Sequence, residues 1–286
     1  MILRDNPLFF VLAVLALAGC TAPTTVKKYA GISKKAGETF SAVHEDLYRS
    51  CVRRQYYEGL SVTFPDLDSL ETEAVASCAD FKRAGRGLKA ANKTLVDYLK
   101  TLSKLADKNI VVYDDEFDDF ADALEDTYPF DDRRIEAVGS VTSFVAEAAA
   151  GAWRRRNLGK AIERTNDDIQ VIAAMFEQVL STDYKRLLEG EREAARKYYL
   201  GKVKLEGRGD PLSAVVVYDL WRKEDAAIDE KQDGAGACAG IYRRIAKGHQ
   251  KLFDNREDLD SKEMRKFAVE YTETIEELIA EVTSAF

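Results

Sequence analysis

The chain has 286 residues, of which 46% are hydrophobic and 32% are charged, and its formal net charge is −8 at pH 7. A chain of this length can bury a substantial core in one or two domains. Its net acidity argues against binding to nucleic acid and against adhesion to anionic lipid by charge alone, so no nucleic-acid partner is expected.

The first twenty residues have the order typical of a secretory signal peptide. Arg4 precedes an apolar run over residues 8–16, and the tetrapeptide Leu-Ala-Gly-Cys at 17–20 follows. The apolar run is too short for a transmembrane helix. The tetrapeptide resembles the lipobox of bacterial lipoproteins. This resemblance implies cleavage before Cys20 and attachment of a diacylglyceryl group, often with a further acyl chain such as palmitate, to that cysteine.

The resemblance also implies a location. Thr21, rather than Asp, follows Cys20, and in a Gram-negative lipoprotein this implies the periplasmic face of the outer membrane. Residues 20–26 would form a short lipidated tether that reaches roughly 20 Å when extended, so the folded body should lie close to the bilayer. We expect a signal peptide at 1–19, this tether at 20–26, and a helical domain at 27–286 with an alternative internal boundary at 206–211.

Apolar residues spaced by three and four predict two long helices in the first third of the chain. One covers about 26–57 and ends before Gly59–Pro65. The other begins at a capping pattern of Asp68 and Glu71 and continues to Ala106. Its apolar residues alternate at intervals of four and three, a period of 3.5 that indicates coiled-coil-like packing against neighbouring helices.

The rest of the chain is also predicted to be helical. A short amphipathic segment covers Phe117–Leu124, and Gly207–Pro211 is the clearest internal break. The apolar pattern at 217–252 fits one long helix or two helices joined near Gly234. We further expect a helix from Asp132 to about Arg164, one capped by Thr165 or Asn166 that runs past Tyr199, and a last one capped by Asp260 and Glu263. Long helices with short turns predict an all-α fold, an elongated antiparallel bundle.

The cysteines that remain after Cys20 predict one disulfide. Cys51, Cys78 and Cys238 are an odd number for an oxidising compartment. Cys51 lies thirteen residues before Phe64, at the centre of the first predicted turn, and Cys78 lies fourteen residues after it. Antiparallel pairing of the two helices brings both to the same level, and a bridge there would contribute about 3 kcal/mol. The alternative is two buried free thiols.

An acidic stretch suggests a calcium site of the EF-hand type, with ligands at loop positions one, three, five, nine and twelve. The carboxylates at these positions are Asp114, Glu116, Asp118, Asp122 and Glu125. Position six requires Gly for a sharp turn, and Asp119 occupies it. The same residues place Phe117 and Phe120 on one helical face with the acids on the other, which favours a solvated helix, so we predict no metal.

Residues 138–153 are the most apolar part of the chain beyond Cys20, and Arg154, Arg155 and Arg156 follow them. A small, apolar segment with a basic flank is compatible with insertion into a membrane. However, Glu136 and Glu147 bracket fewer than the ~18 apolar residues that spanning requires, which favours a helix packed on all sides. The arginines would contact lipid headgroups, an acidic partner or water.

Catalytic patterns are weak. The two histidines, His44 and His249, belong to different predicted helices, and no nucleophile elbow, Cys-x-x-Cys, zinc-protease pattern or phosphate-binding glycine loop is present. His249 and Cys238 share a face and could form a metal pair, although a hydrogen-bonded core histidine is favoured. We therefore expect neither a cofactor nor an enzyme.

The leading functional hypothesis is a non-enzymatic lipoprotein, anchored in the outer membrane, that binds another envelope protein or acts as a scaffold. One alternative is a membrane-active helical protein that exposes residues 138–153. The other is an enzyme of unknown class. The sequence leaves the oligomeric state open.

Overall fold

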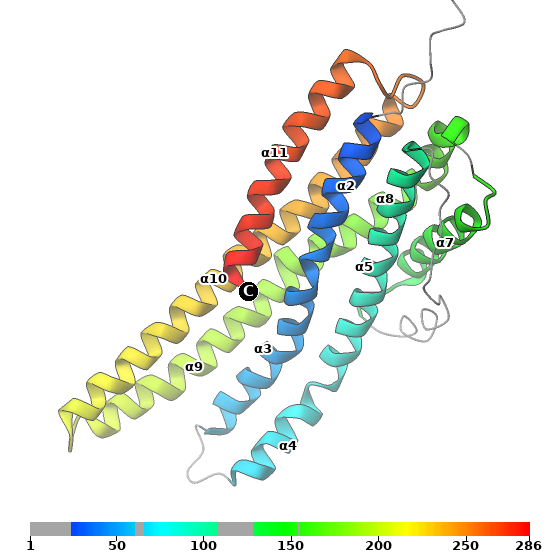
Figure 1. Cartoon of the computed structure of the whole chain (residues 1–286). Helices are drawn as coiled ribbons and strands as arrows, with labels where there is room; N and C mark the ends of the chain where they lie inside the picture. Colours follow the sequence, from blue (N-terminus) through cyan, green and yellow to red (C-terminus); the bar gives the residue numbers. More distant parts are fainter. Residues whose placement is uncertain (1–23, 61–65, 108–127, 154) are drawn as a thin grey trace, which may run out of the picture.

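The computed structural model describes residues 24–60, 66–107, 128–153 and 155–286, which form helices without a strand among them (Figure 1). The predicted all-α class is confirmed for these residues. The helices are α2 (Thr24–Glu38), α3 (Phe40–Leu60), α4 (Leu67–Ser77), α5 (Ala79–Ala106), α7 (Asp132–Ala149), α8 (Leu158–Gln178), α9 (Lys185–Glu206), α10 (Pro211–Asp254) and α11 (Lys262–Ala285). A 3-10 turn, η2 (Arg155–Asn157), precedes α8, and a π-helical turn, η3 (Val179–Tyr184), joins α8 to α9.

Helix α10 runs through the length of the bundle. Its 44 residues extend about 66 Å, and it contacts α2, α8, α9 and α11. The continuous helical rod formed by α8, η3 and α9 returns antiparallel to it. Helices α2 and α3 lie along this pair, with α5 beside them and α7 packed on α5 and α8 (Figure 1). The resulting bundle is elongated along α10.

The two long helices predicted for the first third of the chain are each divided. Helix α2 ends in a turn at Thr39, whose backbone N–H and hydroxyl both bond to the carbonyl of Ala36, before α3 begins. The second is interrupted at Cys78, between α4 and α5. Its N-cap is Asp66 rather than Asp68, because the Asp66 carboxylate accepts from the backbone N–H of Asp68.

The helix predicted from Asp132 to Arg164 ends much earlier, at Ala149. Gly151 follows with a positive φ of 80°, a left-handed conformation that glycine tolerates and that ends the helix. The next helix, α8, already begins at Leu158. The predicted caps, Thr165 and Asn166, are therefore wrong, since both lie buried inside α8, where their side chains bond to other helices.

The break at Gly207–Pro211 is observed between α9 and α10. Asp210 caps α10 by accepting from the N–H of Leu212, and Pro211 occupies the first turn. The helix then continues through Gly234, so the single-helix alternative is the observed one. Ser261 caps α11, not Asp260 or Glu263; its hydroxyl accepts from the N–H of Met264 at 3.1 Å.

Aromatic side chains fill the core where α10 crosses its neighbours. Phe176 of α8 and Tyr242 of α10 stack with ring centroids 4.3 Å apart, and Phe40 of α3 meets Phe176 edge-on. At Gly248 of α10 the helices approach more closely, because a Cβ atom there would lie 2.5 Å from the ring of Tyr29 in α2. The core therefore depends on a residue without a side chain at this crossing.

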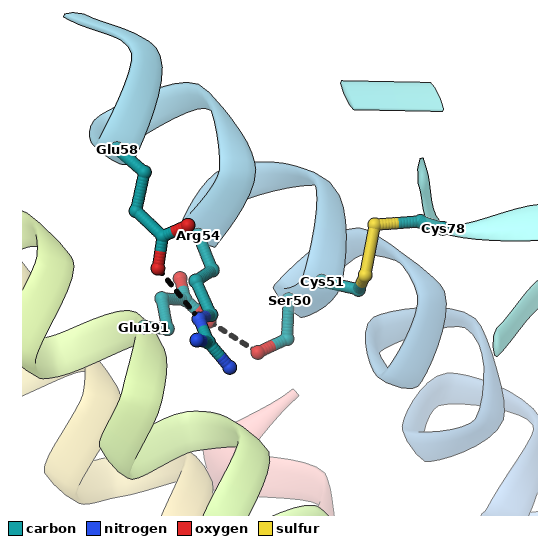
Figure 2. The surroundings of a disulfide bond; sticks show 6 residues. All are labelled: Ser50, Cys51, Arg54, Glu58, Cys78 and Glu191. Atoms are coloured by element: carbon teal, nitrogen blue, oxygen red, sulfur yellow. Dashed lines mark hydrogen bonds and ion pairs between the residues drawn. A yellow bond between two sulfur atoms is a disulfide. The ribbon is translucent and has the colours of Figure 1, made fainter. Parts of the chain in front are cut away.

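The predicted disulfide between Cys51 and Cys78 is present. The two Cα atoms are 5.9 Å apart, and both residues are buried. Figure 2 shows the bridge on one side of α3. On another side of the same helix, the Ser50 hydroxyl donates to the carboxylate of Glu191 in α9 at 2.5 Å. Helix α3 is thereby fixed to both the α4–α5 junction and α9.

Candidate interaction surface

The largest exposed apolar side chains gather where α9 turns into α10. We call residues 196–223, the last turns of α9 and the first turns of α10, the hairpin end. Six of its large apolar side chains are between 46% and 73% exposed: Leu205, Leu212, Val215, Val216, Tyr218 and Leu220. In Figure 1 the hairpin end extends to one end of the bundle, far from the first residues of α2. Such a cluster of exposed apolar groups is typical of a binding surface.

These side chains are exposed because only one helix face is needed to hold the hairpin together. Trp221 and Ile228 are buried against α9, and Arg192 of α9 forms ion pairs with Asp225 and Asp229 of α10. From Trp221 onward α10 packs against α9 through one face, and the apolar residues on the other faces of α10 stay exposed. Packing within the hairpin therefore does not explain why these exposed residues are apolar.

A tyrosine-lined groove lies beside this surface. Its volume is about 410 Å³, and its lining comes from α3, α9 and α10. The lining residues are Val52, Arg53, Tyr56, Tyr57, Leu60, Tyr198, Tyr199 and Leu220. The ring of Tyr57 lies 5.9 Å from that of Tyr198 and 5.7 Å from that of Tyr199. We call this the tyrosine groove.

The hydroxyl of Tyr57 stays neutral at physiological pH. Partial burial raises its pKa, and the hydrogen bond with Tyr199 and the negative charge of Glu224 raise the pKa further. Tyrosine rings with neutral hydroxyls offer apolar faces and hydrogen-bonding edges together, the combination enriched at protein interfaces. The groove is therefore suited to hold an apolar side chain beside polar backbone.

A buried charge cluster holds Arg53, one of the residues that line the groove. Arg53 donates to Asp46 at 2.9 Å and 3.1 Å and to Glu191 through two nitrogens. Burial alone would raise the pKa of Asp46, but its hydrogen bonds and charge contact with Arg53 outweigh burial and lower it. Tyr184 donates to the same carboxylate at 2.6 Å. Because Arg53, Asp46 and Glu191 are all paired, the cluster connects α3 to α9 without leaving a buried charge unpaired.

The π-helical turn η3 contributes to this cluster. Tyr184 is its last residue, and the extra residue of a π-turn changes the direction in which the following side chains point. Burial and the Asp46 carboxylate raise the pKa of Tyr184, so it remains a hydrogen-bond donor. The turn thus supports the groove from the side of α9.

The hairpin end is basic, although the whole chain is acidic. Residues 196–223 contain seven Lys or Arg and three Asp or Glu, a formal charge of +4 within a chain of −8. Most of the basic side chains are exposed: Arg196, Lys197, Lys204, Arg208, Arg222 and Lys223. Lys202 lies with its Nζ 5.7 Å from the ring centroid of Tyr198, at the edge of the groove. The exposed apolar groups therefore lie on a segment whose net charge is positive.

Most of the sites proposed from the sequence lie elsewhere or outside the described residues. Outside them are Cys20, Asp114, Glu116, Asp118, Asp122, Glu125 and Arg154. Arg155 begins η2, and Arg156 is exposed. Within the described ranges, no group of three or more His, Cys, Asp or Glu side chains is placed to hold a metal ion.

His249 and Cys238 do not form a metal pair. Both ring nitrogens of His249 are hydrogen-bonded, one to Tyr98 and one to Asn166, as expected for a core histidine. Burial lowers its pKa to about 3. Cys238 is a buried free thiol whose pKa is raised by burial to about 12, so it stays protonated. His44 is on α3, with its ring 5.9 Å from that of Phe40.

The apolar segment at 138–153 packs inward along one face of α7. Its buried residues are Val138, Val141, Phe144, Val145 and Ala148. Ser143 and Ala146 are exposed, so the helix is amphipathic rather than packed on all sides. The rings of Trp153 and Phe144 are tilted against one another with centroids 5.2 Å apart, and the Trp153 indole N–H donates to Glu147. Among the described helices, none is both long and apolar enough to cross a bilayer.

The sequence analysis missed the hairpin end and the tyrosine groove. A signal for the first was present, because apolar residues at 212, 215, 216, 217, 218 and 220 cover more of a helix than one packed stripe requires. The groove had no such signal, since its tyrosines come from helices far apart in the chain. Comparison with protein-family models, curated proteins and solved structures finds no match to this chain.

Proposed function

We propose that this protein is a lipid-anchored, periplasmic envelope component that binds another envelope protein through its hairpin end and performs no catalysis. The observation that carries this proposal is the cluster of exposed apolar side chains at the hairpin end, from Leu205 to Leu220, beside the tyrosine groove. Tyrosines and aliphatic anchors around a concave site are typical of protein–protein contacts.

The positions of the two ends of the bundle support an anchored scaffold. The Thr24 hydroxyl, at the start of α2, bonds to Asp260, just beyond the last residue of α10. The hairpin end lies at the first residue of α10, about 66 Å away along that helix. Cys20 is four residues before Thr24 and thus within roughly 14 Å of it. A lipid on Cys20 would therefore hold the α2 end of the bundle close to the membrane and leave the hairpin end, at the other end of the bundle, able to extend away from it.

The anchor is tested on Cys20 itself. In cells fed a clickable palmitate analogue, we expect label on the wild-type protein and membrane fractionation that follows the outer membrane. The Cys20→Ala variant should carry no label and lose membrane association. Label that persists in this variant, or an unmodified cysteine in the intact mass of the wild type, would contradict the anchor.

The interaction is tested with a photo-crosslinking amino acid at Val216 of the hairpin end. A matched control places it at Val269 of α11, another exposed apolar residue. We expect a reproducible crosslink to one envelope protein from position 216 in intact cells and none from position 269. Equal crosslinking from both positions, or none from 216, would count against the hairpin end as a binding surface.

A further inference from the structure

We infer that the tyrosine groove and the basic hairpin end together bind an acidic, amphipathic helical segment of a partner protein, with an apolar side chain of that segment inserted between the tyrosines. This inference rests on the proposed function and specifies the chemistry of the partner. Its basis is charge complementarity: the hairpin end, which supplies Tyr198, Tyr199 and Leu220 of the groove, has a formal charge of +4, whereas the chain as a whole has −8.

The shape of the groove fits one helical ridge. It is enclosed on one side by α3 and on the other by α9 and α10, so its walls are two roughly parallel helical surfaces. An open groove of about 410 Å³ has room for one or two large apolar side chains, so it suits a partner with protruding side chains better than a partner with a flat surface. A helix that presents such anchors at intervals of three and four residues fits this geometry.

The rigidity of the groove lowers the cost of binding. Arg53, one of the lining residues, is held by Asp46 and Glu191, while the disulfide holds another side of α3 at Cys51. Little side-chain conformational freedom is therefore lost when a partner enters. The arginine is already neutralised by two carboxylates, so the acids of the partner would pair with the outer ring of cations, not with Arg53.

That outer ring lies on both helices of the hairpin. On α9, Lys202 follows Tyr198 by four residues and Tyr199 by three, so it shares their face, and its Nζ lies 5.7 Å from the ring centroid of Tyr198. On α10, the exposed Lys223 follows the groove residue Leu220 by three residues and forms a surface ion pair with Asp219. Carboxylates on the flanks of a bound helix would meet positive charge on each side of the apolar contact. Such rim charges act mainly on the association rate and on partner choice.

The experiment measures binding of a labelled amphipathic peptide built from Leu and Glu, by fluorescence anisotropy with the full-length protein. A peptide with the same Leu face and Lys in place of Glu is the comparison. We expect the wild-type protein to bind the Leu–Glu peptide more tightly than the Leu–Lys peptide. The Tyr57→Ala and Tyr199→Ala variants should bind the Leu–Glu peptide at least about tenfold more weakly than the wild type, and Lys202→Glu and Lys223→Glu several-fold more weakly. Lys160→Glu, on the exposed face of α8, is the charge control and should bind as the wild type does.

Several outcomes would overturn the inference. These are absence of Leu–Glu binding, equal binding of the Leu–Lys peptide, and binding that the groove and charge variants leave unchanged. Vesicles of phosphatidylcholine and phosphatidylglycerol that compete through the same residues would assign the surface to anionic lipid instead. Concentration-dependent self-association that Lys202→Glu abolishes would assign it to a second copy. The charge reversals keep the test valid if a tyrosine variant unfolds.

Failure of this inference is distinguishable from failure of the proposed function. A crosslink from Val216 in cells, without binding of the Leu–Glu peptide, would leave the hairpin end as an interaction surface and remove only the acidic helix as its occupant.

Discussion

The hydroxyl of Tyr98 in α5 lies 2.6 Å from Nε2 of His249 in α10, inside the core. The direction of this bond follows from the chain of bonds behind it. Gln250 donates its amide to the carboxylate of Asp254, and its carbonyl accepts from the Asn166 amide. The Asn166 carbonyl therefore faces Nδ1 of His249, 2.9 Å away, which must carry the proton. Nε2 is then the acceptor, and Tyr98 donates to it.

The first prediction concerns this donor. Tyr98→Phe leaves Nε2 of His249 buried without a hydrogen bond, which should cost about 1–3 kcal/mol of unfolding free energy. Urea unfolding followed by circular dichroism measures the change. Tyr218→Phe at the exposed hairpin end is the matched control and should change stability by less than about 0.5 kcal/mol. A Tyr98→Phe protein as stable as the wild type would show that this hydrogen bond does not stabilise the core.

The second prediction concerns the pH dependence of stability. Burial lowers the pKa of His249 from 6.5 to about 3. Between these values the unfolded chain binds a proton that the folded chain excludes, so acid favours unfolding. The contribution of His249 is complete above pH 6.5 and decreases by up to about 1.4 kcal/mol per pH unit below it.

The comparison with His249→Gln isolates this contribution. Carboxylates that titrate in the same range contribute equally to both proteins, so the difference between the two unfolding free energies should shrink from pH 7 to pH 5. A constant difference over this range would show that His249 protonates in the folded state.

The helical class could be predicted from the sequence, but the helix ends could not. The helical class follows from the periodic spacing of apolar residues, because the same residues face the core of the bundle. The capping residue of a helix cannot be read in this way, because a polar side chain caps the helix only if it does not bond to another part of the fold. Thr165 resembles a cap in the sequence, yet its hydroxyl bonds to Tyr98 inside the core. Asp260 likewise accepts from Thr24 and leaves the capping of α11 to Ser261.

The third prediction uses two helical glycines. Gly248→Ala puts a methyl group 2.5 Å from the ring of Tyr29 and 2.9 Å from that of Tyr271, so the helices must separate at a cost of about 1–3 kcal/mol. Gly31→Ala in α2 meets no atom within 4 Å and should stabilise the protein by up to about 1 kcal/mol through helix propensity. Thermal unfolding should shift in opposite directions. A shift of the same sign in both would contradict the close crossing.

The fourth prediction tests the buried charge cluster. Glu191 is fully buried and accepts from Ser50 and Arg53. Glu191→Gln removes half of the negative charge that faces Arg53 and should cost about 3 kcal/mol. Glu193→Gln, two residues along α9 and exposed, should be neutral. If both variants unfold at the same denaturant concentration, the cluster does not stabilise the contact between α3 and α9.

The two parts of the binding surface differ in what the sequence could reveal. The apolar residues at 212, 215, 216, 217, 218 and 220 occupy more than one face of a helix, so an exposed apolar region follows from periodicity alone. Tyr57 and Tyr199 meet where α3 packs against α9, a contact that also contains the Glu191 cluster. The residues of this contact come from distant parts of the chain, and no short-range pattern records their pairing.

The last prediction concerns the disulfide, which closes a loop of sequence separation 27. In the chain-entropy model, a loop of this size contributes about 3.5 kcal/mol by restricting the unfolded chain. Cys51→Ala with Cys78→Ala should lower the unfolding free energy by about this amount, and reduction with dithiothreitol should lower that of the wild type similarly. Cys238→Ala keeps the bridge and should keep the response to reductant, whereas the double variant should lose it. A wild type whose stability is unchanged by complete reduction would show that packing around α3, rather than the bridge, holds the α4–α5 junction in place.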